Sequence, residues 1–287
     1  NQGVELSLNV TPIRNKSFSW NMSFNFNHMW SKVLTLPESI GPNNDFYNSD
    51  TYISNVRGGL IRGHSTGTIT GSTYSRNTAG QIIINPSTGL PVIIGGNSLI
   101  GDRTPDFTLG WQNSLRYKNW SLSFLWDLKV GGDIYNGTEQ ILTGVGKSGR
   151  TANRNTPVIV NGVLNDGLQN SSTPTPNDIV VIPYFLSAYY TTLPDEEFIQ
   201  KKVNWLRLRD ITLSYNFAQR ALRKLKAFKT LSVFLTGNDL VLITNYNGAD
   251  PAVNSNNPGT GGIGGYGLDL GSAPTPLSLS FGLRASF

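Results

Sequence analysis

The sequence has no cysteine and only two histidines, His28 and His64. The absence of cysteine excludes disulfide bonds, thiolate catalysis and cysteine-ligated zinc sites. Only 14% of the residues are charged. A long apolar run is also missing, because the longest one, Ile179 to Leu186, is far shorter than the roughly 18 to 20 residues of a membrane helix. If this chain crosses a membrane, we therefore expect it to do so with strands.

Glycine and aromatic residues are abundant, with 31 glycines and an aromatic content of 10%. This composition favours many strands joined by glycine-rich loops, because helices use more Ala, Glu, Lys and Leu. The net charge of +5 is modest, and the basic residues do not form one stripe with interleaved aromatics, as a nucleic-acid binder would need. We therefore expect an all-β protein without a nucleic-acid partner.

The last segment, Pro276 to Phe287, alternates between apolar and small polar residues. Strand side chains point to opposite faces with period two, so the two kinds of residue lie on opposite faces. A long alternation of this kind is typical of a sheet with lipid on one side and water on the other. The apolar set is Leu277, Leu279, Phe281, Leu283, Ala285 and Phe287.

Six upstream segments repeat the pattern, at about 3–11, 17–31, 107–117, 120–130, 205–217 and 231–240. Segment 17–31 is much longer than the typical 5 or 6 residues of a soluble strand and can cross a tilted bilayer. Leu206 and Leu208 lie on the opposite parity to Leu213, so we expect a bulge, or an exit from the bilayer, near Asp210.

The connections between these segments alternate in length. The long ones are 33–104, 131–204 and 243–273, whereas 218–229 is shorter and is expected to hold one helical turn. Outer-membrane barrels have short periplasmic turns and long extracellular loops. We therefore expect an antiparallel transmembrane β-barrel segment with extracellular long loops and a C-terminus on the periplasmic side.

Four stretches, 101–138, 204–217, 231–254 and 276–287, resemble the C-terminal part of SusC/RagA-type TonB-dependent transporters of Bacteroidota. Two small departures are Asp239, where the family commonly has Asn, and Ala252, where it often has Glu. The resemblance implies that residues 1–287 form about the last seven strands of a 22-stranded barrel. The chain starts without a methionine or an export signal, so we expect a fragment that lacks the plug, the TonB box and the signal peptide.

The resemblance also implies a function and a set of partners. The function is TonB-dependent import of a large nutrient, a glycan or a peptide, across the outer membrane, with no enzymatic activity, cofactor or metal. The implied partners are a SusD-like surface lipoprotein, TonB through the missing N-terminal region, outer-membrane lipid or lipopolysaccharide, and the remainder of the same barrel. Two alternatives are a structural or adhesive barrel that displays its loops, and a soluble carbohydrate-binding module or glycosidase.

Aromatic residues supply the main site candidates. Five tryptophans share parity with the lipid-facing aliphatic residues and are predicted to form a membrane girdle: Trp20, Trp30, Trp111, Trp120 and Trp126. Six tyrosines lie in loops or off that parity and are predicted to contact substrate: Tyr47, Tyr52, Tyr74, Tyr184, Tyr189 and Tyr190. Phe287 resembles the C-terminal signal that the barrel-assembly machinery reads.

Other motifs have simpler explanations. Gly259 to Gly264 matches G-x-G-x-x-G but lacks the flanking strand and helix of a nucleotide site, so we interpret it as a loop. Asp195-Glu196-Glu197 is interpreted as a solvated loop, because neighbouring carboxylates do not by themselves give an opposed glycosidase pair. Asp250, Asn254 and Asp269 have no calcium-loop spacing. Arg207 and Arg209 are expected to pair with carboxylates of neighbouring strands, although anionic lipid is an alternative, and the basic residues between Arg220 and Lys229 to be solvated.

Overall fold

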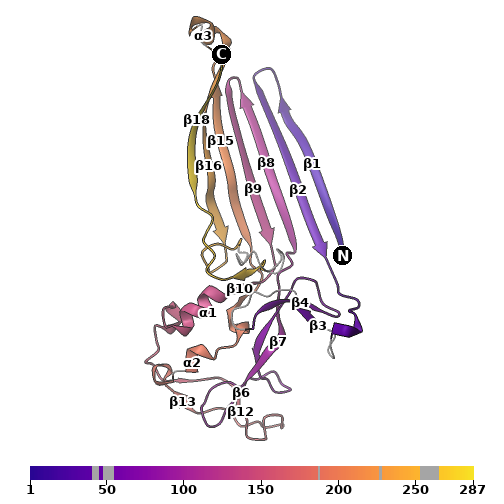
Figure 1. Ribbon diagram of the computed structural model, residues 1–287, viewed down its shortest axis with the longest axis vertical. Coiled ribbons are helices and arrows are strands. Elements are labelled where there is room, and N and C mark those ends of the chain that lie inside the picture. Colours follow the sequence, from indigo (N-terminus) through magenta and orange to yellow (C-terminus); the bar gives the residue numbers. More distant parts are fainter. Residues whose placement is uncertain (41–44, 48–54, 187, 226–227, 253–264) are drawn as a thin grey trace.

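The computed structural model describes residues 1–40, 45–47, 55–186, 188–225, 228–252 and 265–287 (Figure 1). Its main element is a seven-stranded antiparallel sheet in the order β1-β2-β8-β9-β15-β16-β18. The all-β prediction and all seven predicted strands are confirmed. The strands are β1 (Gln2–Arg14), β2 (Phe18–Trp30), β8 (Phe107–Tyr117), β9 (Trp120–Val130), β15 (Trp205–Asn216), β16 (Thr230–Thr244) and β18 (Ser278–Ser286).

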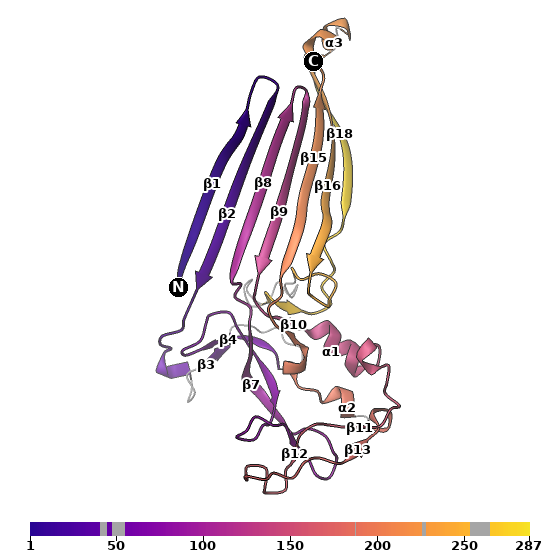
Figure 2. The ribbon, with the colours of Figure 1, turned by 180° about the vertical axis from the view of Figure 1, so that it is seen from behind.

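The two ends of this sheet differ, as both views show (Figures 1 and 2). Tight turns and the short helix α3 (Gln219–Leu225) join the strands at one end, which we call the turn end. The long connections gather at the other end, the loop end. The N-terminus lies at the loop end and the C-terminus at the turn end. None of the helices in the described ranges is long and apolar enough to cross a membrane.

The register of the sheet separates an apolar face from a polar face. One row across six neighbouring strands is apolar throughout: Leu8, Phe24, Trp111, Trp126, Leu208 and Val241. The next row, on the opposite face, is mostly polar: Ser7, Asn25, Gly110, Asp127, Arg207 and Leu242. The alternation in the sequence therefore becomes two chemically distinct surfaces.

The bulge predicted near Asp210 is confirmed. The register of β15 shifts between Leu208 and Asp210 against both of its neighbours, β9 and β16. Because the shift reverses the parity, Leu208 lies opposite Trp126 and joins the face of Leu213. The bulge thus keeps the apolar face continuous and places Arg207 on the polar face. On β16, Asp239 lies opposite the bulge and has a positive φ of 50°. Asp tolerates this conformation better than most residues.

The sixth strand is longer than its sequence pattern indicates. We expected it to end near Leu240, but β16 continues to Thr244 and pairs with Trp205 at the start of β15. The third connection therefore begins after Thr244 and not at Ile243. The irregular backbone at Asp239 interrupts the alternation of apolar and polar residues, which explains why the sequence pattern indicates an earlier end of the strand.

The long connections contain short elements of their own. The first holds η1 (Glu38–Ile40), β3 (Asp45–Tyr47), β4 (Arg57–Ile61), β5 (Thr68–Tyr74), β6 (Ile83–Ile84) and β7 (Ile93–Asp102). The second holds β10 (Ile134–Asn136), α1 (Gly137–Gly144), η2 (Gly149–Thr151), β11 (Val158–Ile159), β12 (Val163–Leu164), β13 (Val180–Val181), η3 (Pro183–Phe185), α2 (Ala188–Thr191), η4 (Asp195–Phe198) and β14 (Ile199–Gln200). The third holds β17 (Leu268–Asp269).

The three connections pack into one module at the loop end. Its buried core combines Ile69 and Ile100 from the first connection, Tyr135 and Phe198 from the second, and Leu268 from the third. Parallel pairing of β6 with β12, and of β10 with β17, joins the connections through the backbone. The loops therefore form a packed body and not three independent excursions.

The two faces of the sheet generate a matched pair of substitutions in the middle of β1. Leu8 is on the apolar face and 49% exposed, whereas its neighbour Asn9 is on the polar face. In the intact protein that contains this chain, Leu8→Arg is expected to lower the free energy of unfolding in a bilayer by about 2 to 4 kcal/mol, because arginine meets hydrocarbon there.

Asn9→Arg is the control, and it is expected to change the free energy of unfolding by less than about 1 kcal/mol, because its side chain enters water. Urea unfolding from liposomes, followed by tryptophan fluorescence, measures both variants. Equal losses for the two variants would contradict the assignment of the faces.

Candidate functional site

A depression of about 530 Å³, lined mostly by residues with polar side chains, opens on the loop module. Its walls come from α1, η2, η4 and β14, and its charged lining residues are Glu139, Arg150 and Glu197. The guanidinium of Arg150 lies 5.0 Å from the ring centroid of Phe198 and donates to a Glu197 carboxylate oxygen at 2.9 Å. The depression thus offers a cation and hydrogen-bonding oxygens to a hydrophilic ligand, while the ring of Phe198 lies buried beside the cation.

Helix caps position the acidic side of this depression. The side chain of Asn136 caps α1 by accepting the backbone N–H of Glu139 at 2.9 Å. The Glu139 carboxylate accepts the hydroxyl of Ser148, and Ser148 itself caps η2 by accepting the backbone N–H of Arg150 at 3.0 Å. These caps satisfy backbone groups that helix ends leave unpaired, so they hold the lining residues in place.

Asp195 is fully buried, and the interpretation as a solvated loop is wrong for this residue. One of its carboxylate oxygens accepts both the backbone N–H and the hydroxyl of Ser72, at 2.8 and 2.7 Å. The other accepts the side-chain amide of Gln140 at 2.9 Å. Asp195 therefore joins η4 to β5 and α1, and its partners offset the cost of burying a charge.

The two neighbouring carboxylates have separate partners. Glu196 accepts the backbone N–H of Tyr74 at 2.8 Å and pairs with Arg76 at 3.0 Å. Glu197 pairs with Arg150. Since each of the three carboxylates is tied to its own part of the loop module, they form no opposed acid and base pair. Their arrangement is that of anchors between loops.

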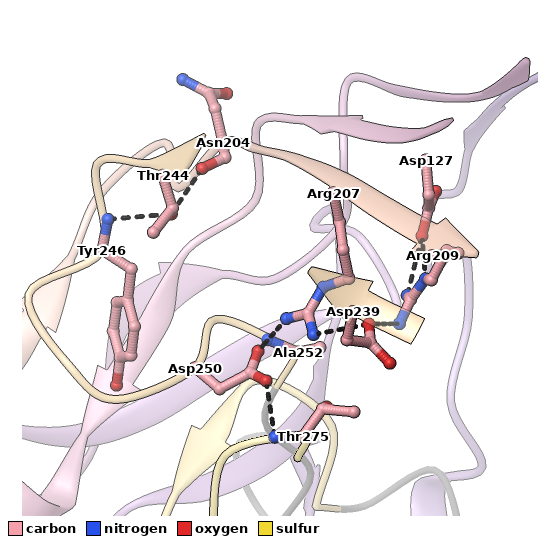
Figure 3. Close-up of polar contacts among 10 residues, drawn as sticks. All are labelled: Asp127, Asn204, Arg207, Arg209, Asp239, Thr244, Tyr246, Asp250, Ala252 and Thr275. Atoms are coloured by element: carbon pink, nitrogen blue, oxygen red, sulfur yellow. Dashed lines mark hydrogen bonds and ion pairs between the residues drawn. The ribbon is translucent and has the colours of Figure 1, made fainter. Parts of the chain in front are cut away.

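Arg207 is the centre of a charged network on the polar face (Figure 3). It is only 2% exposed, and its guanidinium contacts Asp239 on β16 at 3.2 Å and Asp250 in the third connection. Arg209 pairs with Asp127 on β9 at 2.7 Å and approaches Asp239 at 3.7 Å. The expected pairing of both arginines with carboxylates of neighbouring strands is therefore confirmed.

Two aspartates hold the third connection in place, Asp250 against the sheet through Arg207 and Asp269 against the second connection. Asp250 accepts the backbone N–H groups of Ala252 at 2.9 Å and Thr275 at 3.0 Å. Asp269 accepts the hydroxyls of Tyr246 at 2.7 Å and Thr138 at 2.9 Å. Protein donors thus bond to both carboxylates. These bonds argue against the binding of calcium by Asp250 and Asp269. Among the described residues, no cluster of His, Asp or Glu is suited to a metal ion.

The surroundings of Asp250 lower the pKa of its carboxyl group. Burial alone would raise the pKa of its carboxyl group, but the backbone N–H groups of Thr275 and Ala252, together with Arg207, outweigh burial and hold the pKa below its usual range. A carboxyl group whose pKa is lower in the folded than in the unfolded protein stabilises the folded protein at pH values above the ordinary pKa of Asp. This stabilisation is lost as the pH falls through the lowered pKa. The network is therefore fully formed at neutral pH.

Lys129 forms a second contact between the sheet and the third connection, which the sequence pattern did not reveal. Its ammonium is 4.6 Å from the ring centroid of Trp205 and 5.6 Å from that of Tyr266. Arg103 donates to the carbonyl oxygen of Tyr266 at 2.7 Å. The third connection is thus held at both of its ends. Lys129 and Trp205 face each other in the register of β9 and β15, a pairing between distant segments that the sequence pattern does not encode.

A groove of about 610 Å³ follows the polar face of the sheet between β1 and β9. Its lining includes Ser7, Asn25 and Asp127, and also Gly110, where an added Cβ would meet no heavy atom within 4 Å. Most of the residues that line the groove and the depression carry hydrogen-bonding side chains. The depression offers these groups on the loop module, and the groove offers them on the polar face of the sheet.

Comparison with known proteins shows which proteins share this sequence pattern and architecture. The sequence is 28% identical over the whole chain to TonB-dependent receptor P3 of Formosa agariphila, of which the alignment covers 28%. It is 24% identical over the whole chain to TonB-dependent receptor SusC of Bacteroides thetaiotaomicron, of which it covers 26%. The chain is similar over its full length to SusC/RagA-type TonB-dependent receptors. No protein-family model matches it.

The fold agrees with this similarity. The solved structure of the RagAB peptide transporter superposes with a TM-score of 0.62 and 19% identity, covering 99% of this chain and 29% of that one. The RagAB peptide importer in the "open-open" state gives a TM-score of 0.62, 20% identity and coverages of 99% and 28%. The chain thus spans less than a third of the length of these SusC/RagA-type proteins. Receptors of this type are outer-membrane proteins, and a sheet with one apolar and one polar face agrees with that location.

The predicted substrate-contacting tyrosines lie scattered over the loop module. Tyr74 is buried beneath Arg76, and burial raises the pKa of its hydroxyl. Tyr189 and Tyr190 contact each other edge to face at 4.9 Å. Tyr184 is 62% exposed and packs only against the ring of Phe185 among the ring contacts described. Tyr47 lies in β3, and Tyr52 lies outside the described residues.

The aromatic residues of the apolar face follow the expected parity. Trp20 and Trp30 donate their indole N–H groups to Asn113 at 3.0 Å and Gln2 at 2.8 Å. Trp120 is at the turn end, whereas Trp111 and Trp126 face each other near the middle of their strands. Contact of these tryptophans with lipid stays a prediction. So does the assembly role of Phe287, which is exposed and packs on Phe228 at 5.1 Å.

Two further sequence candidates cannot be placed. The glycine-rich stretch Gly259 to Gly264 and the amide of Asn254 lie outside the described residues. The basic residues Arg220, Arg223 and Lys229 are exposed at the turn end, as their interpretation as solvated residues requires.

The Arg207 network makes a prediction about stability. Arg207→Ala in the intact protein removes a buried cation that faces two carboxylates, so we expect the free energy of unfolding to fall by about 3 to 5 kcal/mol. Arg209→Ala is the matched control, because Arg209 is 34% exposed and its ion pairs contribute about 1 kcal/mol or less. Urea unfolding measures both variants, and equal losses would show that burial does not distinguish the two arginines.

Proposed function

We propose that this chain forms part of the barrel wall and of the surface loops of a TonB-dependent importer in the outer membrane. The observation that carries the proposal is the full-length similarity to TonB-dependent receptors together with the two-faced sheet. The apolar face contacts lipid, the polar face lines the lumen, and the remaining strands of the barrel pair with β1 and β18. The chain itself performs no covalent chemistry.

The proposal includes an orientation. The loop module faces the outside of the cell, and the turn end with the C-terminus faces the periplasm, because outer-membrane barrels carry their long loops outside. A SusD-like surface lipoprotein covers the loop module, and TonB acts through a region of the protein that this chain does not contain. The names SusC and RagAB among the relatives support these partners.

The proposed cargo is a large hydrophilic nutrient, either a glycan or a peptide. The depression and the groove support this class, because most of their lining residues carry amide, hydroxyl or charged groups. The peptide transport named for RagAB belongs to that protein. A barrel that only displays its loops is the alternative, and the similarity to proteins named receptors and importers favours import.

Deletion of the gene for the intact protein tests the function. Cells without the protein are expected to lose uptake of one class of complex glycan or peptide, and a protonophore is expected to abolish the same uptake in wild-type cells. Uptake that is undiminished for every glycan and peptide tested would count against an importer and favour display.

Tyr184 tests the placement of the ligand. It is exposed on the loop module, so Tyr184→Ala is expected to weaken substrate binding about tenfold if the ring is a contact, a loss of about 1.4 kcal/mol. Tyr117→Ala removes a similarly exposed ring at the turn end and is expected to leave affinity unchanged. Isothermal titration with the purified protein measures both variants, and equal affinities for the two would remove Tyr184 from the site.

A further inference from the structure

The charge on the polar face of the sheet changes from one end to the other. The sequence has no Asp or Glu in 6–37, 107–126, 211–238 or 270–287, and these four ranges contain the turn-end halves of all seven strands. The acidic residues of the seven strands therefore all lie in the loop-end half of the sheet: Glu5, Asp127, Asp210 and Asp239.

Three arginines lie on the polar face in the turn-end half. In the register, Arg14 and Arg116 flank Ser19 from the two neighbouring strands. Arg284 lies opposite Ser232, one row closer to the turns. All three arginine side chains are exposed, and none of them forms an ion pair in the part of the chain that the structure describes. Because β1 and β18 are the two edges of the sheet, these cations are spread across its whole width.

An aromatic ring supports Arg284 on this face. Its guanidinium lies 6.0 Å from the ring centroid of Phe234. Phe234 pairs with Gly282 on β18, and an added Cβ at Gly282 would collide with the ring. Glycine thus leaves room for the ring on the polar face, and the ring offers the cation a favourable contact.

Ion pairs occupy the loop-end half of the same face. Arg207 contacts Asp239 at 3.2 Å, and Arg209 contacts Asp127 at 2.7 Å. Opposite charges this close to each other largely cancel at longer distances. The loop-end half therefore presents both signs of charge, whereas the described residues of the turn-end half present only positive charge.

A row of uncharged polar side chains separates the ion pairs from the three arginines. It crosses six neighbouring strands and consists of Asn21, Ser114, Ser123, Thr212, Thr236 and Ser280. Hydroxyl and amide groups bond to hydrophilic molecules of either charge. Discrimination by charge in the turn-end half must therefore come from the arginines.

We infer that the turn-end half of the polar face attracts anionic cargo through Arg14, Arg116 and Arg284. The inference deepens the proposed function and rests on it, because cargo meets these residues only if the polar face lines the lumen. Rings of arginine and lysine side chains select anions in membrane pores. Arginine suits this role because it stays charged and its planar fork matches the oxygens of anionic groups. The cargo class is thus a glycan or peptide with net negative charge.

Charged thiol reagents measure the electrostatic potential at this wall without any knowledge of the cargo. Ser121 lies opposite Arg116, so Ser121→Cys places a thiol beside the arginines in the intact protein, once any cysteine outside this chain has been replaced. Relative to a free thiol, an anionic methanethiosulfonate is expected to react about tenfold faster than a cationic one. High salt is expected to reduce this preference. Asn25→Cys, on the same face in the loop-end half, is expected to show no preference for the anionic reagent.

A triple variant removes the three cations. Arg14, Arg116 and Arg284 are changed together to Gln in the Ser121→Cys protein, and the two reagents are then expected to react at similar relative rates. Since the three side chains are exposed, the variant is expected to keep the heat-modifiable gel mobility of a folded barrel. If it does not fold, Arg116→Gln alone is expected to reduce the preference about threefold.

A charge-matched control removes three exposed cations at the loop end. It changes Lys32, Arg62 and Lys147 to Gln. Because these residues lie far from the turn end, the control is expected to keep the tenfold preference at Ser121→Cys.

Uptake by cells tests the cargo. Glutamate-containing peptides are compared with their glutamine counterparts, and oligouronates with the corresponding neutral oligosaccharides, which separates the two sources of negative charge. Within the transported class, the acidic member is expected to enter about tenfold faster in wild type. The triple variant is expected to lose this preference and to keep uptake of the neutral member.

The outcomes distinguish this inference from the proposed function. A thiol at Ser121 that reacts readily but without preference for the anionic reagent overturns the inference and leaves the importer intact. Uptake that ignores the charge of the cargo overturns it too. Thiols at Ser121 and Asn25 that both fail to react would show that the polar face does not meet water, and the proposed function would then fail together with the inference.

Discussion

Pairing of backbone groups within one continuous sheet is the constraint on which the rest of this structure depends. Hydrocarbon offers no hydrogen-bond partners, so each N–H and C=O of a membrane strand must bond to a neighbouring strand. The seven strands meet this demand with unbroken antiparallel registers, apart from one bulge in β15 and one register shift in β1. Since the ladder orients alternate side chains to opposite sides, it also creates the apolar and polar faces.

Charge is distributed to fit this constraint. Carboxylates and their partners gather at the loop end, where Arg207, Asp239 and Asp250 join two strands to the third connection. The bulge in β15 makes this possible, because without it Arg207 would point to the apolar side and Leu208 to the polar side. Asp195 has a comparable role within the loop module. Buried charge thus fixes the loops on the sheet, while the sheet's apolar face stays uncharged.

The sheet could be predicted from the sequence because period-two alternation is local. The strands, the tight turn at Lys118 and the bulge near Asp210 all leave traces within a few residues. The loop module could not be predicted in this way, since the burial of Asp195 depends on Ser72, more than a hundred positions away. The same holds for the parallel pairing of β10 with β17 and for Lys129 between Trp205 and Tyr266. Such contacts arise from three connections packing together, which periodicity does not encode.

The central claim is that one face of the sheet meets lipid and the other meets water, and β2 offers the most direct measurement. This chain has no cysteine, so single cysteines can be placed at successive positions from Met22 to Asn27 in the intact protein once any cysteine outside this chain has been replaced. A small, charged, membrane-impermeant thiol reagent is expected to label positions 23, 25 and 27 and to spare 22, 24 and 26. Labelling that does not alternate, or that alternates with the opposite parity, would contradict the account.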